Sequence, residues 1–211
     1  MKRHSAGKNG PLFTIHVFGF MDIGFKIVLA SNSPRRKELL AGLGLDFEVR
    51  VLPDIDESYP ETMAALDTAE YIAGKKAAAY QSVMADDELI ITADTVVIVG
   101  DEVLGKPADA DEARSMLQKL SGRTHQVVTG VCLTTRQQSA HFSVRTDVTF
   151  KPLTDSEIQY YIEKYKPFDK AGAYGIQEWI GYIGCTGLHG SYYNVMGLPV
   201  QRIYTELQKF T

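Results

Sequence analysis

Apolar segments of strand length alternate with segments of helical periodicity along most of this chain, and this order limits the fold more than any other feature. Residues 27–30 form a short apolar run typical of a buried strand. Residues 34–43 follow with the pattern of a helix, because Ser33 suits the N-cap, Pro34 the first turn and Gly44 the C-terminal end.

The alternation continues to the end of the chain. Further strands are expected at residues 47–52, 89–93, 126–134 and 140–150, with a hairpin made by residues 96–99 and 102–104. Further helices are expected at residues 68–84 and 200–207, and after two capping-box pairs, Asp109 with Glu112 and Thr154 with Glu157. With no strong linker in between, this pattern predicts an α/β protein with a mixed sheet flanked by helices.

Composition places the chain among globular proteins of one large or two small domains. It has 211 residues, of which 45% are hydrophobic and 23% charged, which are ordinary values for such a protein. Lys and Arg number 22 against 26 Asp and Glu, a net charge of −4. The segment 1–20 holds Lys2, Arg3 and Lys8 and no acid, so the remainder carries −7. This acidic balance argues against nucleic acid as a partner, since proteins that bind it usually carry a basic surplus.

The segment 1–20 is expected to be an N-terminal extension, with residues 21–211 forming a single domain. The alternative, a signal peptide, would remove the first expected strand if it were cleaved after Ala30. The apolar run of residues 12–20 is too short to span a bilayer, so no membrane partner is expected. Cys132 and Cys185 form no zinc or disulfide pattern, which fits a reducing, cytoplasmic location.

The segment of residues 31–38 departs from the usual charge pattern of a helix start. The first turn of a helix has free N–H groups and a partial positive charge, so it favours anions. Here it carries Arg35, Arg36 and Lys37 instead. A bound anion would reconcile these charges, since free N–H groups, the Ser33 hydroxyl and two guanidinium groups together suit phosphate. The alternative is a solvated basic turn that is partly offset by the glutamate after it.

Lys76 and Asp94 also depart from local rules. Lys76 falls on the apolar stripe of the helix expected at residues 68–84, where snorkelling to the rim is favoured over neutralising a buried anion. Asp94 ends an apolar run. It is therefore either a turn residue or a base or metal ligand at the carboxyl end of a strand, where ligands bind in open α/β sheets.

Other polar positions carry a weaker signal. Lys106 stands between a glycine and a proline, and Glu57 belongs to an acidic pair in a loop; both are expected to be solvated. The histidines His125, His141 and His189 show no ligand spacing and are interpreted as structural. The motifs GxxxxGK[ST], GxGxxG, GxSxG and HExxH are absent, which disfavours P-loop, Rossmann, serine-hydrolase and zincin chemistry.

The sequence SNSPRRKELL at residues 31–40 resembles the SxSPRRxELL signature of the Maf family, also called septum-formation inhibitor-like proteins. The likeness extends from residue 26 to the C-terminus. It includes DIDE at 54–57, KA at 76–77, ADTV at 93–96, GKP at 105–107, LSG at 120–122, DKAGAYGIQ at 169–177 and GSYYNVMGLP at 190–199.

The resemblance implies an elongated α/β fold like that of inosine triphosphate pyrophosphatases, with a cleft between two lobes. It also implies hydrolysis of a nucleoside triphosphate to monophosphate and pyrophosphate with a divalent metal cation, Mg²⁺ or Mn²⁺. Thr95 and Gln177 match the branch similar to dTTP/UTP pyrophosphatases rather than the branch similar to 7-methyl-GTP pyrophosphatases. Arg35 is a further specificity position in that branch.

Carried over by motif, the resemblance assigns roles to individual residues. Asp94 would accept a proton, or bind metal, and the two roles stay open. Glu57 would help to organise the metal. Phosphates would be held by Ser33, Arg35, Arg36, Lys76 and Lys106.

The resemblance also suggests a homodimer and offers a second function. In that alternative the protein is a nucleotide-binding regulator of cell division that signals by binding. A pure binder could dispense with Asp94, Glu57 and Lys106, yet all three are present, which favours the enzyme.

Overall fold

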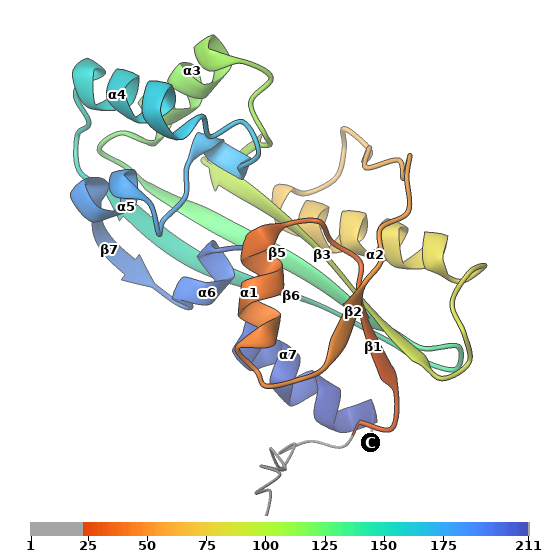
Figure 1. Cartoon of the computed structure of the whole chain (residues 1–211). Helices are drawn as coiled ribbons and strands as arrows, with labels where there is room; N and C mark the ends of the chain where they lie inside the picture. Colours follow the sequence, from red (N-terminus) through yellow and green to blue (C-terminus); the bar gives the residue numbers. More distant parts are fainter. Residues whose placement is uncertain (1–22, 211) are drawn as a thin grey trace, which may run out of the picture.

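In the part of the chain that the structure describes, seven strands form one mixed sheet in the order β2-β1-β3-β5-β6-β7, with β4 paired to β3 (Figure 1). A computed structural model describes residues 23–210 of the chain. β1 runs parallel to β2 and β3, and the other pairs are antiparallel, so the predicted mixed sheet is confirmed. The strands span Lys26–Leu29 (β1), Phe47–Val49 (β2), Glu88–Val99 (β3), Glu102–Leu104 (β4), Thr124–Thr134 (β5), Ser139–Phe150 (β6) and Cys185–His189 (β7).

Helices cover both faces of the sheet and its ends. They span Pro34–Ala41 (α1), Thr68–Tyr80 (α2), Ala110–Leu120 (α3), Asp155–Tyr165 (α4), Trp179–Gly184 (α5), Tyr192–Val195 (α6) and Val200–Leu207 (α7). Short 3₁₀ turns lie at Ala65–Asp67, Ala171–Ala173 and Gln208–Phe210. No helix within residues 23–210 is long and apolar enough to cross a membrane. The extension expected at residues 1–20 lies outside the described residues.

β3 runs as one strand through the region where the sequence pattern predicts a strand, a break at Asp94 and a separate hairpin arm. β5 pairs with it without interruption from Ile90 to Ile98 and supplies the backbone partners that keep the chain extended. The expectation that Asp94 ends a strand is therefore wrong, because it lies in the middle of β3, opposite Gly130 of β5.

The other side of β3 is paired only near its two ends. β1 contacts it up to Ile91, and β4 begins its pairing at Val97. Among the strands that the structure describes, none pairs with residues 92–96 on that side. Successive residues of a strand point to opposite faces, so Asp94 and Thr95 reach this gap from the two faces of the sheet.

The two faces of the sheet carry different helices (Figure 1). Leu89 and Ile91 of β3 pack in one apolar cluster with α1 and α7. Ile90, which points the other way, packs with Tyr80 of α2. The helix expected at residues 68–84 ends at Tyr80, and Val83 in the turn after it is exposed rather than part of the apolar stripe.

A glycine lets α2 lie directly on the sheet. A Cβ atom at Gly130 would stand 2.2 Å from the backbone nitrogen of Glu70 and 2.3 Å from the carbonyl carbon of Ala69. Such distances are below any tolerable contact, so only glycine permits this approach. Because Gly130 is the register partner of Asp94, this close approach of α2 lies next to Asp94 in the sheet.

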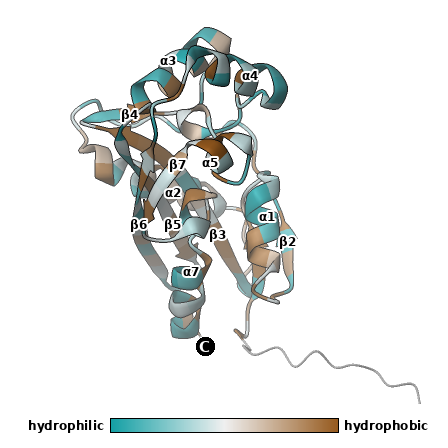
Figure 2. Cartoon of the chain, turned by 90° about the vertical axis from the view of Figure 1, so that its left-hand side faces the viewer, coloured by the Kyte–Doolittle hydropathy of each residue, from teal (hydrophilic) through white to brown (hydrophobic). Residues whose placement is uncertain are grey.

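The end of the sheet away from β1 is covered by α3, α4 and α5. Leu117, Phe150, Tyr161 and Ile180 are buried there in one apolar cluster, and Figure 2 shows the hydrophilic outer sides of α3 and α4. The capping box predicted at the start of α4, Thr154 with Glu157, is confirmed. At α3 only half of the box forms. Asp109 caps Glu112, whose carboxylate accepts from the N–H of Ala108 instead of the N-cap N–H.

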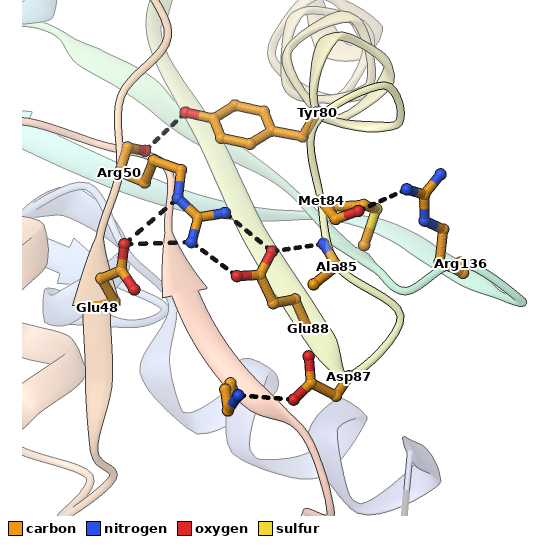
Figure 3. A network of polar contacts seen from close by, with 9 residues as sticks. Glu48, Arg50, Tyr80, Met84, Ala85, Asp87, Glu88 and Arg136 are labelled. Carbon is orange, nitrogen blue, oxygen red and sulfur yellow. Dashed lines mark hydrogen bonds and ion pairs between the residues drawn. The ribbon is translucent and has the colours of Figure 1, made fainter.

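A polar network fixes the chain segment that follows β2 (Figure 3). Arg50 donates from both terminal nitrogens to the carboxylate of Glu88, and a hydrogen bond from Arg50 holds the pKa of Glu88 at about 2. The hydroxyl of Tyr80 donates to the carbonyl of Arg50 over 2.7 Å and accepts from the N–H of Leu52 over 3.1 Å. These contacts anchor the start of the segment that leads to Glu57.

Candidate active site

A cleft of about 520 Å³ opens at the gap beside β3. Its walls come from the start of α1, the middle of β3, one side of α2 and the chain segments around residues 51–57, 169–177 and 195–197. All of the site residues predicted from the sequence line it: Ser33, Arg35, Arg36, Glu57, Lys76, Asp94, Thr95, Lys106 and Gln177. The fold therefore gathers in one place side chains that are widely separated in the sequence, from position 33 to position 177.

The start of α1 has the form that its sequence predicts. Ser33 is the N-cap, and its hydroxyl accepts from the backbone N–H of Arg36 over 3.5 Å. The first turn holds no acidic residue. Pro34 has no N–H, and the N–H groups of Arg36 and Lys37 are bonded to Ser33, so the N–H of Arg35 is the one that remains for a ligand among the described contacts of this turn. The side chains of Arg35 and Arg36 line the cleft without a carboxylate from the same turn.

Arg35 spans the cleft to the opposite wall. Its Nη1 lies 3.0 Å from Oδ2 of Asp169, a residue that sequence reasoning did not select. Burial raises the pKa of Asp169, but hydrogen bonds from Lys170 and Arg35 outweigh that effect and hold the pKa below its ordinary value. The negatively charged Asp169 therefore lies beside Arg35, where an anionic ligand could also bind.

Most N–H groups of Arg36 donate to oxygen atoms of the protein. Its Nε donates to the carbonyl of Gly197 over 2.8 Å, and its Nη1 to the carbonyl of Ala93 over 2.9 Å. Nη1 also contacts Ser31 Oγ, and Nη2 contacts Thr95 Oγ1. A guanidinium has five N–H donors, so these contacts within the described residues use four of them. Arg36 ties α1 to the gap in β3 and retains one donor.

Lys76 pairs with two carboxylates of the cleft. Its Nζ lies 2.7 Å from Oδ1 of Asp94 and 3.1 Å from Oε1 of Glu57, and its side chain is only 12% exposed. The expectation that Lys76 snorkels to the rim is therefore wrong, because an anion beside it offers a better partner than water. Glu57 is half exposed, as a loop residue should be, yet it belongs to this cluster.

The remaining predicted positions lie on the walls. Lys106 is exposed, as predicted, and has no ion-pair partner among residues 23–210. Gln177 has a buried Oε1 atom without a hydrogen-bond partner in the described part of the chain. A donor on a ligand could satisfy this oxygen, and the NH₂ group of the same amide can donate to an acceptor.

A second polar cluster supports the wall that carries Gln177. Lys170 is buried, and its Nζ contacts Asp169 Oδ1 at 2.7 Å and Glu178 Oε1 at 3.1 Å. The hydroxyl of Tyr161 donates to Glu178 and accepts from the N–H of Gly175. Sequence reasoning missed Asp169 and Lys170, although both belong to the motif DKAGAYGIQ that it quoted.

His125 and the two cysteines lie in buried or half-buried positions. His125 is buried and bonds through Nε2 to the hydroxyl of Tyr174, and burial lowers the pKa of His125 to about 4. Cys132 is buried and Cys185 half-buried, both as free thiols. Burial raises the pKa of Cys132 to about 11, so this thiol stays protonated.

The cleft supplies few protein ligands for a metal. Within the described residues, no group of three or more His, Cys, Asp or Glu side chains is placed to hold an ion. Glu57 and Asp94 nevertheless bring two carboxylates together around Lys76. Mg²⁺ often binds through one or two carboxylates and completes its shell with water and substrate phosphates. The donor set therefore fits a divalent cation that enters with a polyphosphate.

The mixed sheet, with a gap that gathers cations around the largely shielded carboxylate of Asp94, defines an α/β protein of the kind that holds a polyanionic ligand in a cleft. The model of the family described as Maf-like protein matches residues 26–210, and the chain belongs to this family. It is 64% identical over 185 residues to a dTTP/UTP pyrophosphatase of Phocaeicola vulgatus, which covers 88% of this chain and 96% of the relative. A dTTP/UTP pyrophosphatase of Parabacteroides distasonis is 60% identical, with the same coverage.

One solved structure, a HAM1 protein from Coxiella burnetii, aligns with 88% of this chain and 99% of its own, at a TM-score of 0.45 and 16% sequence identity.

Proposed function

We propose that this protein hydrolyses dTTP and UTP to the corresponding monophosphate and pyrophosphate. The observation that carries the proposal is the Lys76–Asp94 pair, which places a carboxylate inside a cleft lined by Arg35, Arg36 and Lys106. The names of the relatives support the substrate class, since two of them are dTTP/UTP pyrophosphatases at 64% and 60% identity.

The triphosphate binds through charges that the fold has placed locally. The body of the chain carries a net charge of −7, so a general positive field cannot attract a polyanion. The start of α1 offers the N–H of Arg35 and the Ser33 hydroxyl, and the side chains of Arg35 and Lys106 offer charged donors in the cleft. Asp169 engages only Nη1 of Arg35 among the described residues, so the remaining N–H groups of this guanidinium can donate to the phosphate.

Hydrolysis then forms a bond from water oxygen to the α-phosphorus and breaks the bond from the α-phosphorus to the bridging oxygen. A water oxygen attacks the α-phosphorus, the bond to the oxygen that bridges to the β-phosphorus breaks, and Asp94 accepts the proton that the water loses. Lys76 holds the carboxylate of Asp94 in place before the reaction through their hydrogen bond, and it stabilises the charge that develops on the phosphates. Arg35, Arg36 and Lys106 hold the departing pyrophosphate.

Glu57 and Asp94 would hold the divalent cation, Mg²⁺ or Mn²⁺. When bound, this ion neutralises phosphate charge and polarises the phosphoryl group under attack.

Thr95 and Gln177 recognise the base. Both line the cleft, and Gln177 retains a buried acceptor without a partner among the described residues. Thr95 is small enough to admit a pyrimidine ring beside it. Arg35 adds to this selection from the rim, where it contacts the opposite wall.

One domain, residues 21–211, carries this function, and the segment 1–20 is an extension. A cytoplasmic location is supported by the two free cysteines, Cys132 and Cys185. We further expect a homodimer and no nucleic-acid partner.

A panel of nucleoside triphosphates tests the proposal, with pyrophosphate and inorganic phosphate both quantified, in Mg²⁺ and in EDTA. The proposal predicts equal amounts of monophosphate and pyrophosphate, with dTTP and UTP as the best substrates. Tight binding of nucleotide without turnover would favour the regulator of cell division instead. Release of inorganic phosphate with a diphosphate would contradict attack at the α-phosphorus.

A further inference from the structure

The hydroxyl of Thr95 belongs to a hydrogen-bond chain that leads from the cleft into the interior. Nη2 of Arg36 lies 3.1 Å from Thr95 Oγ1, which lies 3.0 Å from Oγ1 of Thr129, its register partner on β5. Thr129 Oγ1 in turn lies 3.0 Å from the backbone oxygen of Asn194. Thr129 and Asn194 are fully buried, so water does not compete for these contacts.

The two ends of this chain fix the direction of every hydrogen bond in it. A guanidinium can only donate, and a carbonyl oxygen can only accept. Thr129 must give its single proton to Asn194, because two oxygens 3.0 Å apart with no hydrogen between them would repel each other. Thr95 then gives its own proton to Thr129 and accepts one from Arg36.

The direction of the chain determines what Thr95 can offer to a ligand. A hydroxyl has one proton and two lone pairs, and here the proton and one lone pair are already used. Thr95 Oγ1 therefore presents only an acceptor to the cleft. Asn194 keeps this arrangement rigid, since its Nδ2 donates to Val127 O at 3.1 Å and to Thr146 Oγ1 at 3.0 Å.

We propose that Thr129 and Asn194 are positioning residues for specificity, which make Thr95 an obligate acceptor and so select a base that presents an N–H group. The proposal rests on the proposed function. Uracil and thymine carry an N–H at N3, whereas cytosine has a lone pair there. A cytosine N3 would meet the lone pair of Thr95, and both acceptors would remain unsatisfied in the cleft.

Two substitutions at position 129 separate the hydroxyl from the shape of the side chain. Thr129→Val keeps the shape but frees the proton of Thr95 to turn toward the cleft, where it can donate to cytosine N3. The ratio of kcat/KM for UTP to that for CTP should fall about tenfold, which corresponds to about 1.4 kcal/mol. Thr129→Ser keeps the hydroxyl and should keep the ratio within twofold of wild type. Thr134→Val, a buried threonine on the same strand that does not line the cleft, serves as the matched control.

A Thr129→Val protein with an unchanged UTP to CTP ratio, or one that loses both activities equally, would overturn the proposal. Binding of UMP and CMP by calorimetry provides a readout that does not depend on turnover. The wild-type protein should prefer UMP, and Thr129→Val should lose that preference. Equal binding of UMP and CMP by the wild type would also overturn the proposal, whereas a wild type that binds UMP preferentially but hydrolyses no triphosphate would support it and count against the proposed function alone.

Discussion

Nζ of Lys76 lies 2.7 Å from Oδ1 of Asp94, across the contact between α2 and β3. Both side chains are largely shielded from water, at 12% and 15% exposure, so the pair is held in one geometry rather than shared with solvent. Gly130 makes this possible, because any larger residue there would push α2 away from the sheet.

Removing the ammonium of Lys76 should damage catalysis more than folding. Lys76→Met leaves Asp94 without its partner and the phosphates without a nearby cation, so kcat with UTP should fall by about 100-fold or more. Steady-state kinetics of pyrophosphate release measures this. Lys75→Met is the matched control, since Lys75 pairs with Asp56 and does not line the cleft. Equal losses in the two variants would contradict the role given to Lys76.

The sequence predicts the order of the elements better than it predicts their ends. The strand at residues 27–30, the helix starts at Ser33 and Thr154 and the mixed sheet all follow from local patterns, which the structure confirms. The continuity of β3 through Asp94 could not be predicted in this way, because it depends on pairing with β5, a strand that follows only after β4 and α3.

In the candidate site, too, local features could be predicted from the sequence and contacts between distant elements could not. Motifs in the sequence select the residues that line the cleft, since each motif is local. Partnerships across the fold escape that reasoning: Lys76 with Asp94, Arg35 with Asp169, and Arg36 with the carbonyl of Gly197. Local rules favoured a snorkelling Lys76 because the anion beside it lies on another element.

Arg35 should contribute mainly to substrate binding. It lines the cleft, and its Nη1 contacts Asp169 on the opposite wall. Arg35→Ala should raise KM for UTP by about tenfold, with a smaller effect on kcat, because a charge-assisted hydrogen bond is lost in the ground state as well as in the transition state. Lys37→Ala, in the same helical turn but outside the cleft lining, should change KM by less than twofold. A similar KM for the two variants would refute this assignment.

Gly130 should tolerate no side chain. A methyl group there would meet the backbone of α2 at 2.2 Å, so Gly130→Ala should lower the free energy of unfolding by about 3 kcal/mol or more. Denaturant unfolding measures the loss. At Gly187 an added Cβ would lie 3.5 Å from Thr149, an ordinary contact, so Gly187→Ala should cost less than about 1 kcal/mol. A stable, fully active Gly130→Ala protein would show that α2 does not need this close approach.

His125 should make the fold sensitive to mild acid. Burial lowers the pKa of His125 from 6.5 to about 4, so the unfolded chain binds the proton more tightly than the folded one. The stability that the neutral imidazole contributes is fully present above about pH 6.5 and falls as the pH drops toward 4. Between pH 7 and pH 4.5 the wild-type protein should lose about 2.5 kcal/mol more stability than His125→Gln. Parallel losses in the two proteins, measured by denaturant unfolding, would exclude this residue as the cause.

The role of Asp94 is tested most directly by the fate of UTP with the wild-type protein and with Asp94→Asn, under saturating substrate and Mg²⁺. The substitution keeps the size of the side chain but removes the negative charge that accepts a proton. The wild type should release UMP and pyrophosphate in equal amounts, and Asp94→Asn should be at least about 100-fold slower while still binding UTP. Unchanged turnover by Asp94→Asn, or UDP and phosphate as the products of the wild type, would contradict the account.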